Sequence, residues 1–454
     1  MLTRTILRTL VTAGLCAALA SPACADEQSD RLQALEKSLA ASNELIAKLS
    51  ARLAELERSV KVAGAAPAAA ASAATAGEAP ANTAQAIAAL QDSVAQISDS
   101  IAHQTTDTGL PLHGFANTGA GWSAGSDPLK LRGFNGGQVD LYLTPQISPR
   151  VRALAEIVLE YNSMSGQMGI DTERLQVGYT VNDGMTLWLG RFHTPLGLWN
   201  TSFHHGANLQ TSIYRPRFVD FEDSGGIIPA HTVGLWATGK VAEGAGRLTY
   251  DAYVGNEHRI IGQQLDFSGY TDDSHGKMLG ANVGYQFAGA LSGLTLGVHG
   301  YGTTVKAYDL NDQFLNATKQ LMTGGYVGYD ENDWEIIGEY YHFDDTDVAG
   351  GPNRTSNLEF LQVGRTFVGF TPYLRAEKAG LDPLDNYFRS QETGRSYRRE
   401  VLGVRYALDA RSSIKFELSS TQESGNTLLD GTGSPYALTA VNYRRGSLQF
   451  AVAF

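Results

Sequence analysis

Apolar and polar residues alternate with a period of two over most of the chain from His113 onward. In the last segment, SLQFAVAF, apolar side chains occupy every second position from Leu448 to Phe454. This period is typical of β-strands that have one apolar face. The segments are about ten residues long, which is the length that a tilted strand needs to cross a membrane. The alternation therefore predicts a large all-β unit.

The connections between these segments alternate in length. The short ones are ISPR (147–150), NDG (182–184), ENDW (331–334) and DARS (409–412), and the long ones span 193–230, 255–276, 380–396 and 423–440. Counting the segments gives about sixteen, and single-chain bacterial barrels have even strand numbers. We therefore predict an all-β transmembrane barrel of about 16 antiparallel strands over 110–454. Its last strand should close against the first near His113.

The N-terminal part of the chain has a different pattern. A basic start and a short apolar run that ends in SPACAD predict a signal peptide over 1–25. A heptad repeat of apolar residues predicts an α-helical coiled coil over 26–62, for which we favour parallel self-association over a helix packed on its own chain. An Ala/Pro-rich linker (63–81) and a short helix (82–105) follow.

Charge and cysteine content exclude several classes of function. The formal net charge of -12 argues against a nucleic-acid partner. Both cysteines, Cys16 and Cys24, lie in the predicted signal peptide, so the exported chain has no thiol for a disulfide, a metal site or nucleophilic catalysis. We expect no cofactor and no bound metal. No later stretch has about 18 consecutive apolar residues, so a chain in the membrane must cross it as a closed barrel.

The signal peptide, the hairpin rhythm and the terminal Phe454 together resemble the Gram-negative outer-membrane porins. In that family the barrel assembly machinery recognises the final Phe, so the resemblance implies that Phe454 is an assembly signal. The stretch GRFHTPLGLWN (190–200) is loosely similar to the phosphate-selective porin family, and the coiled coil is similar to that of some sugar porins. The resemblance implies a homotrimer in contact with outer-membrane lipid, with its N-terminal helix in the periplasm.

This resemblance implies a passive diffusion porin, a water-filled channel for small hydrophilic solutes or ions. Two alternatives remain: a structural tether that links the barrel to the cell wall through its coiled coil, and a barrel enzyme. The segment GWSAG (121–125) fits the pattern around a nucleophilic serine, but that pattern requires a strand that enters a helix. Here a loop between strands is expected after Ser123, so we predict that the protein is not an enzyme.

The third long connection carries the candidate selectivity site. Porins of about sixteen strands generally fold their third long loop into the pore, and the longest connection here, 193–230, is the third. Opposite charges on it would create a transverse field at a constriction, whereas a loop outside the barrel would merely expose them to solvent. The predicted constriction residues are Arg191, His193, Arg215, Arg217, Asp220, Glu222 and Asp223. With His193, the adjacent His204 and His205 form no recognised metal spacing.

Ionised residues also occur on one face of the predicted strands. The predicted pore-wall residues are Arg152, Glu156, Arg375, Glu377, Arg399, Arg405, Lys415 and Glu417. One hairpin alone does not decide which face is internal, because a soluble sandwich would bury the apolar face instead. An anion-selective pore should show a basic ladder, and the mixture of signs argues against strong phosphate selectivity.

Overall fold

A computed structural model describes residues 112–454, apart from 163–166, 204–205, 221–225 and 267–275. The predicted signal peptide, coiled coil, linker and short helix therefore lie outside the described residues. Among the described residues, no helix is long and apolar enough to span a membrane.

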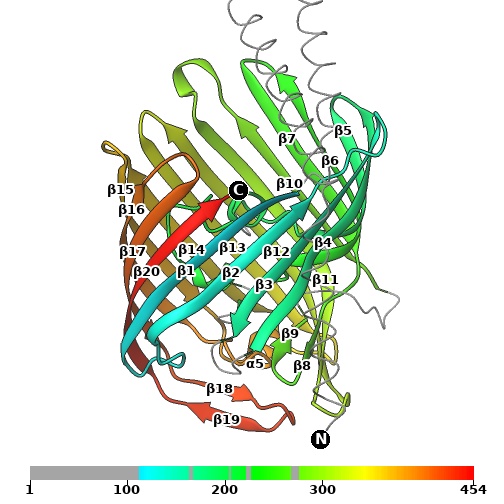
Figure 1. Ribbon diagram of the computed structural model, residues 1–454. Helices are drawn as coiled ribbons and strands as arrows, with labels where there is room; N and C mark the ends of the chain where they lie inside the picture. The colour runs from blue at the N-terminus through cyan, green and yellow to red at the C-terminus, as the bar shows by residue number, and fades with distance from the viewer. Residues whose placement is uncertain (1–111, 163–166, 204–205, 221–225, 267–275) are drawn as a thin grey trace, which may run out of the picture. The chain divides into compact units, whose positions relative to one another are not determined.

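Sixteen antiparallel strands pair in chain order within one sheet and close it into a barrel (Figure 1), which confirms the predicted strand number. These strands are β1 (Leu112–Gly125), β2 (Arg132–Leu143), β3 (Val151–Asn162), β4 (Gln167–Asn182), β5 (Met185–His193), β6 (His231–Glu243), β7 (Gly246–Gly255), β10 (Met278–Gln286), β11 (Leu294–Tyr308), β12 (Phe314–Glu331), β13 (Trp334–Asp347), β14 (Arg354–Arg365), β15 (Phe370–Gly380), β16 (Tyr397–Ala407), β17 (Ser412–Glu423) and β20 (Val441–Ala453).

Short elements lie in the connections. The segment after β7 carries β8 (Arg259–Ile261) and β9 (Gln264–Leu265), and β8 pairs in parallel with β11. The segment after β17 forms a separate hairpin of β18 (Asn426–Leu429) and β19 (Pro435–Leu438). The helical turns are α4 (Trp199–Ser202), η1 (Arg217–Val219), η2 (Gly289–Leu291) and α5 (Asn386–Arg389).

The first and last strands close the barrel, as predicted. β20 pairs with β1 from Tyr443 opposite Gly125 to Ala453 opposite Phe115. Beyond it, the N–H of Phe454 donates to the carbonyl of Gly114 (2.9 Å), and the N–H of Gly114 donates to the carbonyl of Phe454 (3.0 Å). A Cβ at position 114 would overlap the Phe454 ring and lie 2.9 Å from the carbonyl oxygen of Asp140, so a larger residue here would have to displace one of them.

The apolar face of the strands is outside and the ionised face is inside. Leu402 on β16 is 53% exposed, whereas Arg399 on the same strand is 4% exposed. On the adjacent strand β17, Leu418 is exposed while Lys415 and Glu417 are buried. This orientation is the reverse of a soluble sandwich and matches a barrel surrounded by lipid.

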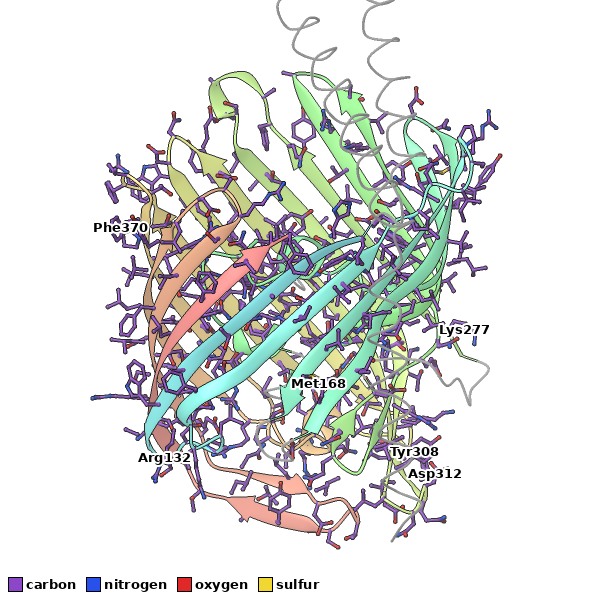
Figure 2. The ribbon with its side chains drawn as sticks, in the orientation of Figure 1. Arg132, Met168, Lys277, Tyr308, Asp312 and Phe370 are labelled. Carbon is purple, nitrogen blue, oxygen red and sulfur yellow. The ribbon has the colours of Figure 1, made fainter. Side chains whose placement is uncertain are left out.

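Long and short connections lie at opposite rims. Tyr308 and Asp312 mark the rim of the long loops, and Phe370 lies toward the rim of the short turns (Figure 2). The tightest turns have two residues, and in one of them Asn332 and Asp333 adopt positive φ angles of 54° and 66°. Such angles suit the right-handed twist of the flanking strands, so local sequence determines the geometry of these two-residue turns.

Candidate functional site: a loop bound inside the barrel

Residues 194–230, here called loop L3, connect β5 to β6 and include α4 and η1. L3 contacts inward-facing side chains of strands distant from its own two, from Asn282 on β10 to Ser447 on β20. The longest connection therefore lies against the inner wall of the barrel instead of projecting from the rim (Figure 1).

Carboxylates of the wall accept hydrogen bonds from the L3 backbone. Oε1 of Glu339 accepts from the N–H groups of Leu198 (2.7 Å) and Trp199 (2.5 Å), at the start of α4. Oε2 of Glu417 accepts from the N–H of Ile213 (3.0 Å), and Oε2 of Glu377 accepts from the N–H of Arg217 (2.7 Å). Charged acceptors make the stronger class of hydrogen bond, so these contacts fix the loop at several points.

Cations of the wall complete the attachment by donating to L3 carbonyls. Nζ of Lys415 donates to the carbonyls of Ala207, Gln210 (2.7 Å) and Ser212 (3.0 Å). The guanidinium group of Arg375 donates to the carbonyls of Tyr214 (3.0 Å) and Arg215 (3.2 Å). Arg405 donates to the carbonyl of Asn208 (3.2 Å).

Buried aromatic side chains fill the space between L3 and the wall. The ring of Phe218 lies 5.3 Å from that of Tyr341 and 5.9 Å from that of Phe360. Trp199 packs edge to face on Phe360 at 5.7 Å. Aromatic pairs of this kind add stability beyond the area that they bury, so L3 has an apolar core of its own.

The predicted constriction residues occupy different environments. Arg191 is 2% exposed; it donates to the carbonyl of Thr172 and contacts His231. Arg217 is 8% exposed; it donates to Oε1 of Glu423 (2.6 Å), and its guanidinium carbon lies 4.6 Å from the centroid of the Tyr397 ring.

The other predicted constriction residues on L3 differ in solvent exposure, and two of them lie outside the described residues. Arg215 is partly exposed, whereas Asp220 is buried. Glu222 and Asp223 lie outside the described residues. Of the arginines predicted for the constriction, Arg215 is thus the one whose side chain retains access to solvent.

All eight predicted pore-wall residues point inward, and most of them contact protein rather than open lumen. Arg375 and Glu377 form an ion pair of 2.8 Å, and Arg399 lies 3.8 Å from Glu417. Glu156 is buried and pairs with Arg174. Arg152 is exposed, with its guanidinium carbon 4.9 Å from the centroid of the Trp188 ring. The sequence predicted that these residues share the ionised face of their strands, but it did not predict that several of them bind L3.

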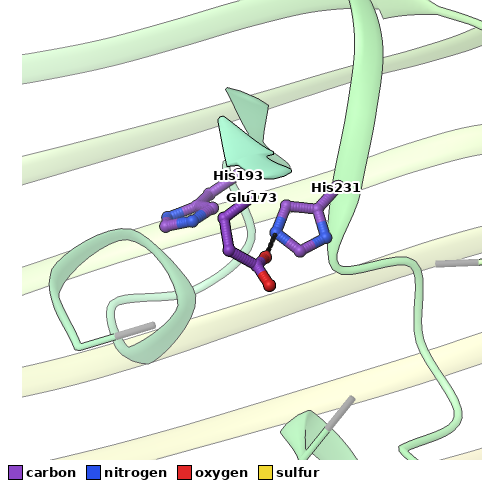
Figure 3. Close-up of side chains that lie close together, drawn as sticks. All are labelled: Glu173, His193 and His231. Atoms are coloured by element: carbon purple, nitrogen blue, oxygen red, sulfur yellow. Dashed lines mark ion pairs between the residues drawn. The ribbon is translucent and has the colours of Figure 1, made fainter. Parts of the chain in front are cut away.

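The stems of L3 meet at a cluster that the sequence analysis missed. His193 and His231 are directly opposite each other on β5 and β6, and Glu173 reaches them from β4 (Figure 3). The potential ligand atoms of these three residues lie within 4.8 Å of one another, and His and Glu are zinc ligands. The dipeptide His-Thr recurs at both stems, and the hydroxyl groups of Thr194 and Thr232 lie 2.8 Å apart, so this repeat was a usable signal.

Arg191 determines how this cluster is best interpreted. Its Nη2 lies 3.1 Å from Nδ1 of His231. A guanidinium group only donates, which favours the tautomer whose ring proton is on Nε2, 2.7 Å from Oε2 of Glu173. A metal would need the lone pair of that Nε2, and Arg191 places a positive charge 3.9 Å from the same carboxylate. We therefore interpret the cluster as an ionic clamp at the base of L3.

Comparisons with known proteins identify the fold. No protein-family model and no curated protein matches the sequence. Among solved structures, an anion-selective porin from Comamonas acidovorans matches with a TM-score of 0.51 at 15% identity, covering 76% of this chain and 99% of that one. OmpT, an outer membrane protein of Vibrio cholerae, matches with a TM-score of 0.47 at 12% identity, covering 75% and 98%. The outer membrane channel DcaP of Acinetobacter baumannii matches with a TM-score of 0.45 at 11% identity, covering 76% and 97%. The described barrel has the fold of the outer-membrane porins.

Proposed function

We propose that this chain is a passive diffusion porin of the outer membrane. It forms a water-filled channel for small hydrophilic solutes or ions, assembles as a homotrimer and keeps its N-terminal helix in the periplasm. The observation that carries the proposal is L3, which is fixed inside a closed sixteen-strand barrel by buried charges. A loop that is bound to the inner wall in this way narrows the lumen but does not close it.

The distribution of polarity supports a lumen that contains water. Ionised side chains occupy the inner face while leucines such as Leu374 and Leu402 cover the outer face. Buried charges are costly unless they are paired or hydrogen-bonded, and the lumen supplies both protein partners and solvent. A barrel with an apolar outer band and a polar interior is the arrangement of channel-forming barrels.

Selectivity in this proposal comes from few accessible charges. Arg215 on L3 and Arg152 on β3 are inward cations with solvent-exposed area, whereas Lys415 and Arg375 are buried against L3 carbonyls. At an effective dielectric constant near 20, one charge a few Å from a passing ion contributes about 1 to 4 kcal/mol. The channel should therefore discriminate between ions by graded steps rather than absolutely.

The alternatives have less support. The tether depends on residues 26–105, which lie outside the described residues. For an enzyme, Ser123 would have to sit on a turn into a helix, but it lies in β1 and is followed by a loop to β2. Its hydroxyl group lies 3.5 Å from the carbonyl of Leu131.

Planar bilayer recording tests the proposal. Purified protein refolded in detergent should produce stepwise single-channel currents, and boiled protein from the same preparation should produce none. Folded, membrane-inserted protein that conducts no ions would contradict the channel. Deletion of 26–105 should preserve conductance; loss of envelope integrity in the deletion strain with unchanged conductance would instead support a tether.

A further inference from the structure

A cavity of about 270 Å³ lies at the long-loop rim, away from the L3 clamp. The ends of β12, β13 and β14 form one side, and the loop 381–396, which carries α5, forms the other. Its polar lining includes Thr318, Asp345, Asp347, Arg354, Asp385 and Arg389. The cavity thus joins segments that are distant in sequence and are not part of the proposed channel site.

Two carboxyl groups in this cavity are buried and meet each other. Asp345 at the end of β13 and Asp385 before α5 are each 1% exposed, and their carboxyl groups lie within hydrogen-bonding reach of each other. Like charges at such a distance repel, and burial removes the water that would screen them. A proton or a cation must therefore accompany the pair.

Each carboxyl group is positioned through only one of its oxygens. Oδ2 of Asp345 accepts from Nε2 of Gln320 (3.1 Å), and Gln320 is itself fixed by the hydroxyl group of Tyr301 (2.7 Å). Oδ1 of Asp385 accepts from the N–H of Tyr387 (2.9 Å). Oδ1 of Asp345 and Oδ2 of Asp385 are buried and receive no hydrogen bond from an N–H or hydroxyl donor of the described residues.

A third oxygen in the same cavity is also without a partner. Thr318 is 2% exposed, and its hydroxyl group makes no hydrogen bond to any described residue. A buried hydroxyl group normally finds a partner, because leaving it unpaired costs about 1 to 3 kcal/mol. Asp347, by contrast, is satisfied by the side chain of Asn386 (2.5 Å) and the N–H of Ala349 (2.8 Å).

We propose that this cavity binds a hard divalent cation such as Ca²⁺ through Asp345, Asp385 and Thr318. Carboxylate and hydroxyl oxygens are ligands of Ca²⁺ and Mg²⁺, and a cavity of this volume has room for the waters that complete the coordination. The ion ties the loop 381–396 to the end of β13. Arg389 lines the same cavity and Arg354 lies 3.6 Å from Asp382, so nearby positive charge keeps the affinity moderate.

Calcium titration of the full-length protein tests this site. The protein is refolded in detergent, treated with a chelator and desalted, and then titrated with CaCl₂ in a calorimeter, with MgCl₂ and NaCl as comparisons. We expect one saturable Ca²⁺ site per chain with a Kd of about 10⁻⁴ to 10⁻³ M. NaCl should give no saturable binding.

Four variants assign the ligands. Asp345→Asn and Asp385→Asn should each weaken Ca²⁺ binding about tenfold or more, because each removes a charged ligand. Thr318→Val retains shape and charge and should weaken binding a few-fold. Glu392→Gln is the matched control: it removes one exposed negative charge from the same loop, and Glu392 does not line the cavity. Heat-modifiable gel mobility confirms that each variant has folded.

Three results would overturn the proposal. The wild type could show no saturable Ca²⁺ binding up to about 10 mM, which would leave a shared proton as the only companion of the two carboxyl groups. Folded Asp345→Asn, Asp385→Asn and Thr318→Val could all bind as the wild type does. The Glu392→Gln control could lose as much affinity as Asp385→Asn, which would indicate that the ion responds to general surface charge.

Discussion

Lys415 on β17 and Gln210 on L3 are 205 residues apart, yet Nζ of Lys415 donates to the carbonyl of Gln210 at 2.7 Å. The same ammonium group donates to the carbonyls of Ala207 and Ser212, and the side chain is completely buried. A single wall residue therefore holds a six-residue segment of L3 in place. In the proposed channel, this charge fixes L3 in place and does not face a permeating anion.

Lys415→Met should release this part of L3. The substitution leaves three carbonyls without their donor. It should therefore weaken the binding of residues 207–212 to the barrel wall by about 3 kcal/mol. We expect larger and noisier single-channel currents with unchanged barrel assembly. Lys378→Met, at a site 52% exposed and 3.5 Å from Glu359, serves as the control and should conduct like the wild type. Identical current traces for the two variants would contradict a fixing role for Lys415.

Arg215→Ala and Arg217→Ala should have different effects although the residues are neighbours. Arg215 keeps exposed area, so its removal should shift the permeability ratio toward cations by about two- to fivefold. Arg217 is buried against Glu423 and Tyr397, so its removal should loosen η1 and change selectivity little. Reversal potentials under a salt gradient measure both variants and the double variant. A reversal potential unchanged in the double variant would place L3 outside the conduction path.

Phe454→Ala should reduce assembly more than stability. The ring is 54% exposed, so its contribution to the folded barrel is below about 2 kcal/mol, and the substitution keeps both backbone hydrogen bonds to Gly114. We expect a low level of heat-resistant barrel in membranes but a nearly unchanged denaturant midpoint for protein refolded in detergent. Phe450→Ala, on β20 four residues before Phe454 and 41% exposed, is the matched control. Equal membrane levels for the two variants would remove the assembly role of Phe454.

Local patterns explain what could be predicted from the sequence. The strand number and the shared face of Lys415 and Glu417 follow from a period of two, which each strand carries by itself, and the closure near His113 follows from the barrel that the whole pattern predicts. The partners of those charges did not follow, because the contacts to Gln210 and Ile213 join segments about two hundred residues apart. No local spacing encodes such pairs.

Glu173 illustrates a second limit, which is a break in the alternation. It is the extra residue of a β-bulge in β4, opposite the step from Glu156 to Ile157 on β3. Before the bulge the outward side chains include Met168 (60% exposed), and after it they include Leu175 (61% exposed). Counting by twos from Leu175 would place Glu173 outside, whereas the bulge turns it inward to His231.

Stability of the loop 381–396 should depend on pH through Asp385. Burial raises the pKa of this carboxyl group to about 6, and Asp382 adds to the increase, while the hydrogen bond with Asp345, the N–H of Tyr387 and the charge of Arg354 oppose it. Asp345 and Gln320 face it from the wall, and Arg389 lines the same cavity. A carboxyl group whose pKa is higher in the folded state than in the unfolded state favours folding while it is protonated. Its stabilising contribution is therefore complete below about pH 4 and is lost as the pH rises through 6.

Hydrogen exchange of the loop 381–396 in cation-free detergent, corrected for intrinsic rates, measures this effect. Protection should be greater at pH 5 than at pH 7.5, because Asp385 loses its proton at the higher pH and leaves a buried negative charge beside the carboxyl group of Asp345. Asp385→Asn removes the titrating group and should give nearly equal protection at both pH values. Added Ca²⁺ should restore protection to the wild type at pH 7.5 but not to the variant, since the ion replaces the proton between the two carboxylates. Equal protection of the wild type at both pH values would mean that the position of the loop does not depend on a proton or a cation between Asp345 and Asp385.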